Sequence, residues 1–212
     1  MQKIRMVAVG AVAAGLLAGA APANAVQDQV SQQTQSAQAK GDTKMKVLKE
    51  FDYSRSKKYQ LPLRLGEYHR NKKGKMVGFG WTKIKVKHNI TKYGLVGWLA
   101  KSPNIDHLRG PRYNLTGFAH RVKCSGGRCK VVDRRKMLLA TDETMTATGG
   151  RGRFAFFGAV TAFCVGTEKC PTWVNTKFKP RMTALNTAAP GDQYVFSYKP
   201  LKVSKGRLVP AA

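Results

Sequence analysis

Acidic residues are scarce in this sequence. Its 212 residues contain 11 Asp and Glu against 38 Lys and Arg, which gives a formal net charge of +27 at pH 7. A small domain stays soluble with a net charge of only ~2–8 in magnitude. We therefore expect an anionic partner. Nucleic acid, an acidic cell-wall polymer and a lipid surface all remain open on charge alone.

Several catalytic signatures are also absent. The sequence has no Walker loop, no H-E-x-x-H, no G-x-S-x-G and no paired-carboxylate constellation, so the hydrolase classes that use them have little support. The spacings typical of zinc sites, C-x₂-C and His-x₃₋₅-His, are missing as well. We expect neither a metal site nor a cofactor.

Long apolar runs are missing after residue 25. No later stretch approaches the ~20 apolar residues of a membrane-spanning helix, so we expect no stable membrane insertion. Residues 1–25 have the parts of a signal peptide: two basic residues, an uncharged apolar run and the small-x-small site Ala23-Asn24-Ala25. We predict a secreted, extracellular protein. Cleavage before Val26 removes two of the 38 basic residues and no acidic one, which leaves a net charge of +25.

The segment after the signal peptide has little to bury. Residues 26–45 are rich in Gln, Ser and Ala and contain no aromatic residue, which is typical of a disordered tether. Residues 46–64 mix a few apolar residues with many basic ones. Two interpretations are open: a short helix or strand that docks on the domain, or a continuation of the linker. The predicted organisation is a signal peptide (1–25), a disordered or basic linker (26–60), a compact domain (61–179) and a tail (180–212) that can add an edge strand through 193–203.

Only four cysteines occur, in two close pairs, Cys124 with Cys129 and Cys164 with Cys170. Four cysteines allow three disulfide pairings, and the local pairing needs no assumption about the fold. Ser125–Arg128 is a turn by composition and lies between two strand-like segments, which is typical of a hairpin. We predict two local disulfides in an exported protein, each contributing about 2 kcal/mol according to the chain-entropy model.

The stretch Gly78–Ile90 concentrates the reactive and cationic side chains. Alternation places Ile84 and His88 on one face of a half-buried strand, whereas helical spacing places them on one face and Lys83 and Lys87 on another. The period alone slightly favours a strand for 83–90 and a helix for 91–101. In both cases His88 faces the apolar side beside lysines. It is then either a proton carrier near neutral pH or a packed core histidine.

Phe154–Cys164 is the most apolar run after the signal peptide and is rich in aromatic residues. Its length and composition predict the central strand of the sheet. Thr161 is the odd residue within it. It is either an ordinary threonine at a β position or a hydroxyl that a rigid strand presents to a phosphate.

Two motifs together resemble a known group. They are G-F-G-W-x-K-I-x-x-K-H-N-I over residues 78–90 and V-T-A-F-C-x₅-C-P-x-W-V-N over residues 160–175, with the cysteine-closed hairpin between them. The pattern resembles small exported bacterial proteins, and its order is similar to the barnase/EndoU/colicin/RelE-like toxin ribonucleases. That resemblance favours a helix over 81–89. It implies catalytic roles for His88, the preceding Lys87, and the strand hydroxyl of Thr161.

The sequence departs from the resembled pattern at one position. Lys83 stands where such nucleases usually have a first histidine, so a two-histidine pair is missing. Lys83 can stabilise a charged phosphorane, but it is a poor proton shuttle unless its pKa is lowered. Of the other histidines, His120 on a predicted strand is the candidate for a second proton carrier.

The resulting prediction is an α+β domain with one or two helices packed on a three- to five-stranded antiparallel sheet and stapled by two local disulfides. The function that it favours is metal-independent RNA cleavage by His88, Lys83, Lys87 and Thr161, with an immunity or inhibitor protein as a further partner. The alternatives are a non-catalytic module for nucleic acid or a cell-wall polymer, and a structural or inhibitor-like secreted protein. The residues expected to bind nucleic acid are Lys85, Arg121, Lys123, Arg128 and Lys130.

Overall fold

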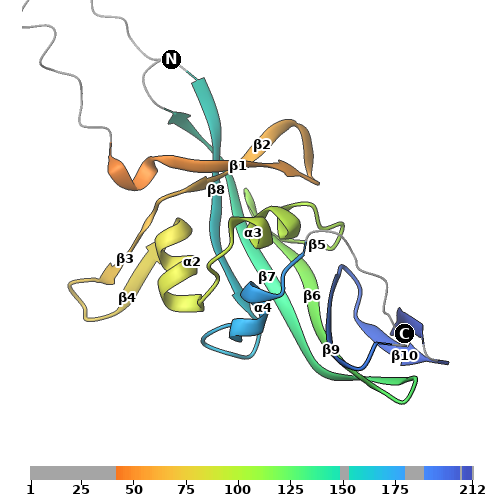
Figure 1. Cartoon of the computed structure of the whole chain (residues 1–212). Coiled ribbons are helices and arrows are strands. Elements are labelled where there is room, and N and C mark those ends of the chain that lie inside the picture. The colour runs from red at the N-terminus through yellow and green to blue at the C-terminus, as the bar shows by residue number, and fades with distance from the viewer. Residues whose placement is uncertain (1–41, 149–152, 180–188, 206, 212) are drawn as a thin grey trace, which may run out of the picture. The chain divides into compact units, whose positions relative to one another are not determined.

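The computed structural model describes residues 42–148, 153–179, 189–205 and 207–211 (Figure 1). The predicted signal peptide and residues 26–41 of the predicted tether lie outside the described residues. The first described element is the 3₁₀ helix η1 (Thr43–Met45).

Five antiparallel strands form the main sheet (Figure 1). β6 pairs with β7 along its whole length, with β5 at its first residues and with β9 at its last. β6 and β7 are joined through Gly126-Gly127, with φ of 56° and 73°, which glycine adopts readily. The predicted hairpin is therefore confirmed. The strands are β5 (Ile105–Arg109), β6 (Arg112–Ser125), β7 (Arg128–Thr148), β8 (Arg153–Cys164) and β9 (Gly191–Ser197).

The prediction that Phe154–Cys164 forms the central strand is wrong. Among the described strands, β8 is hydrogen-bonded only to β7 and ends the sheet. Its outer edge is covered by Arg64, which is 2% exposed and donates to the carbonyls of Phe156 (3.1 Å) and Phe157 (2.9 Å). The run is apolar because other elements bury it, and composition does not distinguish such a covered edge from a central position.

The domain begins earlier than predicted, with a hairpin that starts before residue 61. β1 (Val47–Tyr53) and β2 (Ser56–Arg64) form an antiparallel hairpin, and Phe51, Leu61 and Leu63 are buried in the core. The predicted boundary at residue 61 therefore falls inside β2. The apolar residues scattered between basic ones in this segment are the ones that face the core.

Two helices, α2 (Gly80–His88) and α3 (Tyr93–Ala100), lie next to each other beside the sheet (Figure 1). A short hairpin of β3 (Glu67–Arg70) and β4 (Met76–Phe79) leads into α2, and α3 follows. The helix predicted over 81–89 is confirmed. It ends at Asn89, whose φ of 55° is left-handed, a conformation that asparagine tolerates at a helix terminus. Residues 91–101 also contain the expected helix.

One core joins the helices to the sheet. Ile84 of α2 and Leu95 and Leu99 of α3 are fully buried with Leu115 of β6 and Leu139 of β7. We call the face of the sheet that carries Leu115 and Leu139 the inner face, and the opposite face the outer face.

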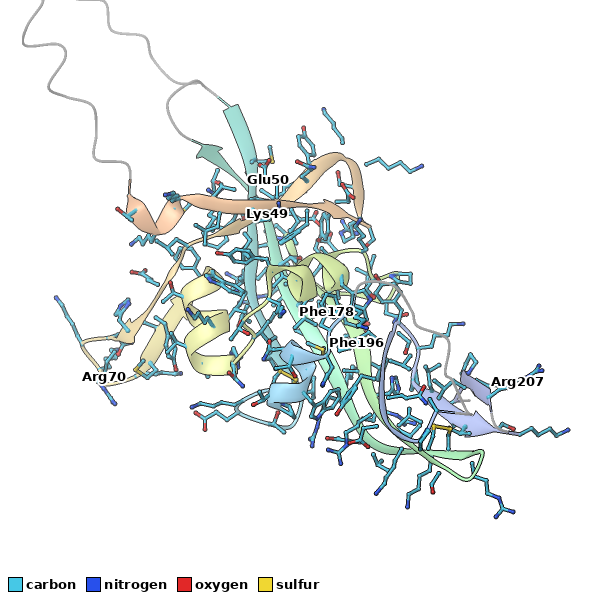
Figure 2. All side chains as sticks on the ribbon, in the orientation of Figure 1. Lys49, Glu50, Arg70, Phe178, Phe196 and Arg207 are labelled. Carbon is cyan, nitrogen blue, oxygen red and sulfur yellow. A yellow bond between two sulfur atoms is a disulfide. The ribbon has the colours of Figure 1, made fainter. Side chains whose placement is uncertain are left out.

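An aromatic group closes the core beside α3. Trp98 stacks on Tyr198 at 5.2 Å between ring centroids and meets Phe196 of β9 edge-on at 5.8 Å. Phe178 and Phe196 lie side by side (Figure 2), with ring centroids 5.0 Å apart. Gly117 of β6 permits this packing, since a Cβ there would lie 2.4 Å from the Trp98 ring.

Both predicted disulfides are confirmed. Cys124–Cys129 closes the end of the β6–β7 hairpin, and Cys164–Cys170 ties the end of β8 to the segment before α4 (Thr172–Thr176). The α+β class and the antiparallel sheet are confirmed with them. A last hairpin, β10 (Leu201–Ser204) and β11 (Arg207–Pro210), contacts β7.

Candidate active site between α2 and β8

The start of α2 is fixed by close backbone packing. A Cβ on Gly66 would lie 1.9 Å from the Phe79 carbonyl oxygen, and one on Gly80, whose φ is +72°, would lie 2.9 Å from the Gly66 Cα. The Thr82 hydroxyl donates to the Leu65 carbonyl at 2.9 Å. Gly66 and Gly80, the second glycine of the G-F-G motif, therefore allow α2 to pack against the β2–β3 junction, which is a structural role.

Two ring contacts align α2 with β8. At the start of the helix, Phe79 packs on Phe157 with centroids 4.9 Å apart. At its end, His88 packs on Phe163 with centroids 5.3 Å apart. The helix therefore runs along the edge strand β8.

His88 is held by the disulfide-closed loop after β8. It is 8% exposed, its Nδ1–H donates to the Glu168 carbonyl at 3.3 Å, and its own carbonyl accepts from the Cys170 N–H at 3.0 Å. Burial lowers the pKa of His88, and the charges of Lys87 and Lys83 lower it further against the effect of the Glu168 carbonyl. His88 is therefore neutral at neutral pH, with Nε2 as the basic atom.

Lys83 and Lys87 lie one helical turn apart and are half-buried, whereas Lys85 is exposed. Burial lowers the pKa of Lys83, with a further contribution from the charge of Lys87. Within the described residues, none of the ion pairs includes Lys83 or Lys87. A partly desolvated cation such as Lys83, without a carboxylate partner among the described residues, attracts an anion more strongly than a solvated surface lysine does.

Thr161 lies on the same face of β8 as Phe163, because the two are separated by two residues along the strand. Its Oγ1 is buried and has no hydrogen-bond partner among the described residues. The hydroxyl oxygen is covered by the protein, and it would need another χ1 rotamer to meet a phosphate. Lys83, Lys87 and His88 thus share α2, and Thr161 lies on the neighbouring strand β8. We call these two adjacent elements the α2–β8 line.

The other predicted cations lie elsewhere. Lys123, Arg128 and Lys130 are exposed near the disulfide-closed end of the β6–β7 hairpin, and Arg207 of β11 extends at the same end (Figure 2). Along β7, the Cys129 pair with Cys124 is eight residues from the Met137 pair with Cys164, which is about 26 Å of strand. We call this end the distal hairpin. The structure does not bring it to His88.

Arg121 is the least available of the cations predicted on β6. Its Nε lies 3.9 Å from the Asp192 carboxylate of β9, so part of its charge is neutralised within the protein. The cations of the distal hairpin that remain available to a ligand are therefore the exposed ones, Lys123, Arg128 and Lys130.

His120 is not a second proton carrier. It is fully buried, its Nδ1–H donates to the Val195 carbonyl at 3.3 Å, and its Nε2 accepts from the Leu201 N–H at 3.0 Å. Burial lowers the pKa of His120 to about 4. Both ring nitrogens are used to fasten β9 and β10 to β6, which is a structural role.

Sequence reasoning missed two features near α2. Arg64 covers the edge of β8, and no neighbouring residue in the sequence signals that role. A pocket of about 570 Å³ opens beside Phe79 and Phe157. It combines residues from five strands, so no local motif marks it. Its lining residues are Phe79, Leu108, Arg112, Ala140, Thr141, Asp142, Thr144, Phe157 and Val160.

The described part of the chain holds no group of three or more His, Cys, Asp or Glu side chains that could bind a metal ion. None of its helices has the length and apolar character needed to cross a membrane. Comparison with protein-family models, curated proteins and solved structures found no match.

Proposed function

We propose that this protein is an exported, metal-independent ribonuclease whose active site is the α2–β8 line. The observation that carries the proposal is the setting of His88. A buried imidazole with Nδ1–H fixed on a carbonyl presents Nε2 as a base, and two half-buried lysines, Lys83 and Lys87, lie on the same helix. This is the combination that in-line attack of an RNA 2′-hydroxyl on its own phosphate requires.

The proposed reaction assigns one role to each group. His88 Nε2 takes the proton of the 2′-hydroxyl, the 2′-oxygen bonds to phosphorus, and the bond from phosphorus to the 5′-oxygen breaks. The leaving 5′-oxygen takes a proton from the Lys83 ammonium, whose lowered pKa suits that role. Lys87 stabilises the phosphorane, and Thr161 positions a phosphate oxygen after rotation about χ1. The products are a 2′,3′-cyclic phosphate and a 5′-hydroxyl.

Substrate binding is assigned to the wider positive surface. Lys85 is exposed on α2, and the exposed cations of the distal hairpin are placed to hold a second part of the polymer backbone. Contacts of this kind release counterions and are independent of sequence. We also propose that an inhibitor protein covers the site in the producing cell. The two disulfides are consistent with an extracellular protein.

A non-catalytic polyanion-binding module is the second candidate. It is favoured by the low exposure of His88 and by the burial of the Thr161 hydroxyl oxygen, since binding needs neither group. In that case the distal hairpin carries the function and His88 only packs against Phe163.

The experiment that separates the two candidates uses the oxidised protein with labelled RNA and with DNA of the same sequence, in EDTA. The ribonuclease proposal expects RNA to be cut and DNA to be bound but left intact, because DNA lacks the attacking 2′-hydroxyl. Binding of both polymers without cleavage of either would contradict the ribonuclease proposal and support the polyanion-binding module.

A further inference from the structure

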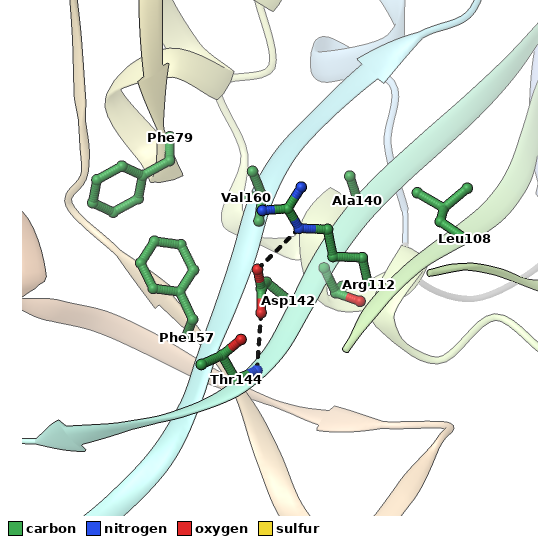
Figure 3. A pocket seen from close by; sticks show the side chains of 9 residues that line it. Phe79, Leu108, Arg112, Ala140, Asp142, Thr144, Phe157 and Val160 are labelled. Atoms are coloured by element: carbon green, nitrogen blue, oxygen red, sulfur yellow. Dashed lines mark hydrogen bonds and ion pairs between the residues drawn. The ribbon is translucent and has the colours of Figure 1, made fainter. Parts of the chain in front are cut away.

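The pocket beside Phe79 is built by side chains of the outer face of the sheet (Figure 3). Arg112 of β6 and Asp142 of β7 are directly opposite each other in the sheet. Ala140 of β7 is opposite Thr161 of β8. The pocket volume of about 570 Å³ lies within the range typical of small-molecule sites, roughly 300–1,000 Å³.

The chemistry of the pocket suits a flat ring with a polar edge. Phe79 and Phe157 form one wall, with Val160, Ala140 and Leu108 along the floor and far side (Figure 3). The polar side carries an ion pair in which Arg112 Nε lies 3.3 Å from Asp142 Oδ2.

Asp142 is the fixed partner of this ion pair, and Arg112 is the exposed one. Asp142 is 14% exposed, and its Oδ1 accepts the Thr144 N–H at 2.9 Å. Arg112 is 58% exposed, so its guanidinium reaches the pocket mouth. A ring that enters would meet aromatic and aliphatic surface on its faces and hydrogen-bonding groups at one edge.

The pocket lies beside the start of α2 and shares β8 with the candidate active site. Phe79 immediately precedes α2, so Lys83 is one helical turn away, about 6 Å along the axis. Thr161, whose sheet partner Ala140 lines the pocket, follows Val160 on β8. The pocket therefore lies at the start of the α2–β8 line and His88 at its end, with Lys83 and Lys87 between them along α2.

We propose that this pocket binds a nucleobase of the RNA, next to the phosphate held by Lys83 and Lys87. This inference rests on the proposed function and names a subsite for its substrate. Aromatic faces are where single-stranded bases stack in proteins without sequence preference. A neutral aromatic ligand would gain nothing from the neighbouring cations, whereas a nucleotide places its ring and its negative charge within reach of both features.

The test uses small probes rather than RNA. Amide chemical shifts of the oxidised protein are followed during titration with adenosine, guanosine, cytidine and uridine 5′-monophosphates, with the matching nucleosides, and with ribose 5-phosphate. A nucleoside monophosphate is expected to shift the amides of Thr144 and Val160 together with that of Lys83. Ribose 5-phosphate is expected to shift only the amides around Lys83 and to bind at least about tenfold more weakly.

Two variants of β7 sharpen the test. Ala140→Phe fills the pocket and is expected to remove the advantage of the monophosphates over ribose 5-phosphate. Val132→Phe adds the same ring to an exposed site on the same strand and is expected to leave that advantage unchanged. Thermal melts of both variants check that the fold is retained.

Three results would overturn the inference. They are equal affinity for ribose 5-phosphate and the monophosphates, nucleotide shifts that spare Thr144 and Val160, and nucleosides that bind as tightly as their monophosphates. These outcomes are independent of cleavage. A protein that binds the monophosphates in the pocket but never cuts RNA loses the proposed reaction and keeps this subsite. A protein that cuts RNA but binds ribose 5-phosphate as tightly as the monophosphates loses only the subsite.

Discussion

Acidification should unfasten the β10–β11 hairpin through His120. At neutral pH the ring is neutral, with Nδ1–H donating to the Val195 carbonyl and Nε2 accepting from the Leu201 N–H. A proton on Nε2 would face the Leu201 N–H, so that hydrogen bond is lost and a charge is left in the core. The unfolded chain takes up the same proton without either penalty.

The size of the effect follows from the difference in pKa between the two states. Burial lowers the pKa of His120 from 6.5 to about 4 in the folded protein. A difference of about 2.5 units corresponds to about 3 kcal/mol of unfolding free energy at 1.36 kcal/mol per unit. The folded pKa is the lower one, so this contribution is complete above pH 6.5 and is lost as the pH falls toward 4. The pKa of His88 is lowered by burial as well, and it adds a loss in the same direction.

The assay is urea unfolding of the oxidised protein at a series of pH values between about 7.5 and 4. The wild type should lose at least about 3 kcal/mol over that range. His120→Gln should start less stable but lose about 3 kcal/mol less on acidification, and His69→Gln, at a more exposed histidine, should follow the wild type. A His120→Gln profile parallel to that of the wild type would refute the reasoning.

Three further outcomes are expected. Gly80→Ala should lower the unfolding free energy by at least about 2 kcal/mol, because its Cβ meets backbone at a φ of +72°; Gly74→Ala, at a φ of +75° with open space, should cost about 1 kcal/mol, and equal losses would contradict the packing argument. Arg64→Met should cost at least about 3 kcal/mol, because it leaves the Phe156 and Phe157 carbonyls unpaired in a buried site; a neutral result in urea unfolding would remove its role at the edge of β8. RNA affinity should fall at least about tenfold between roughly 50 and 200 mM salt, and an affinity that hardly changed would show that the positive charge serves another partner.

Local signals predicted the local structure well. The Gly126-Gly127 turn and the two cysteine spacings depend on a few adjacent residues, and the β6–β7 hairpin and both disulfides follow from them. The period of 83–90 could not distinguish helix from strand, because Ile84 and His88 share a face in both. The burial of His88 was predictable for the same reason.

The features that the sequence did not reveal depend on contacts between distant segments. Phe154–Cys164 is apolar because α2 and β2 cover an edge strand, which composition cannot separate from a central position. Nothing in the sequence distinguishes Arg64 from the other basic residues. Its guanidinium donates hydrogen bonds to carbonyls about ninety residues away. The pocket arises only when five strands come together. His120 lies beside Arg121 in the sequence, yet its ring faces β9 and β10.

The most direct test of the proposed function compares the single-turnover rate of RNA cleavage by the wild type and by His88→Asn in EDTA. Asparagine can still donate to the Glu168 carbonyl, as His88 Nδ1–H does, but it offers no base. We expect the rate to fall by ~10²–10⁴-fold, with RNA affinity and melting temperature nearly unchanged and with 2′,3′-cyclic phosphates among the wild-type products. Equal rates for the two proteins, or no cleavage by the wild type together with a lower melting temperature for His88→Asn, would show that His88 is a packed core histidine.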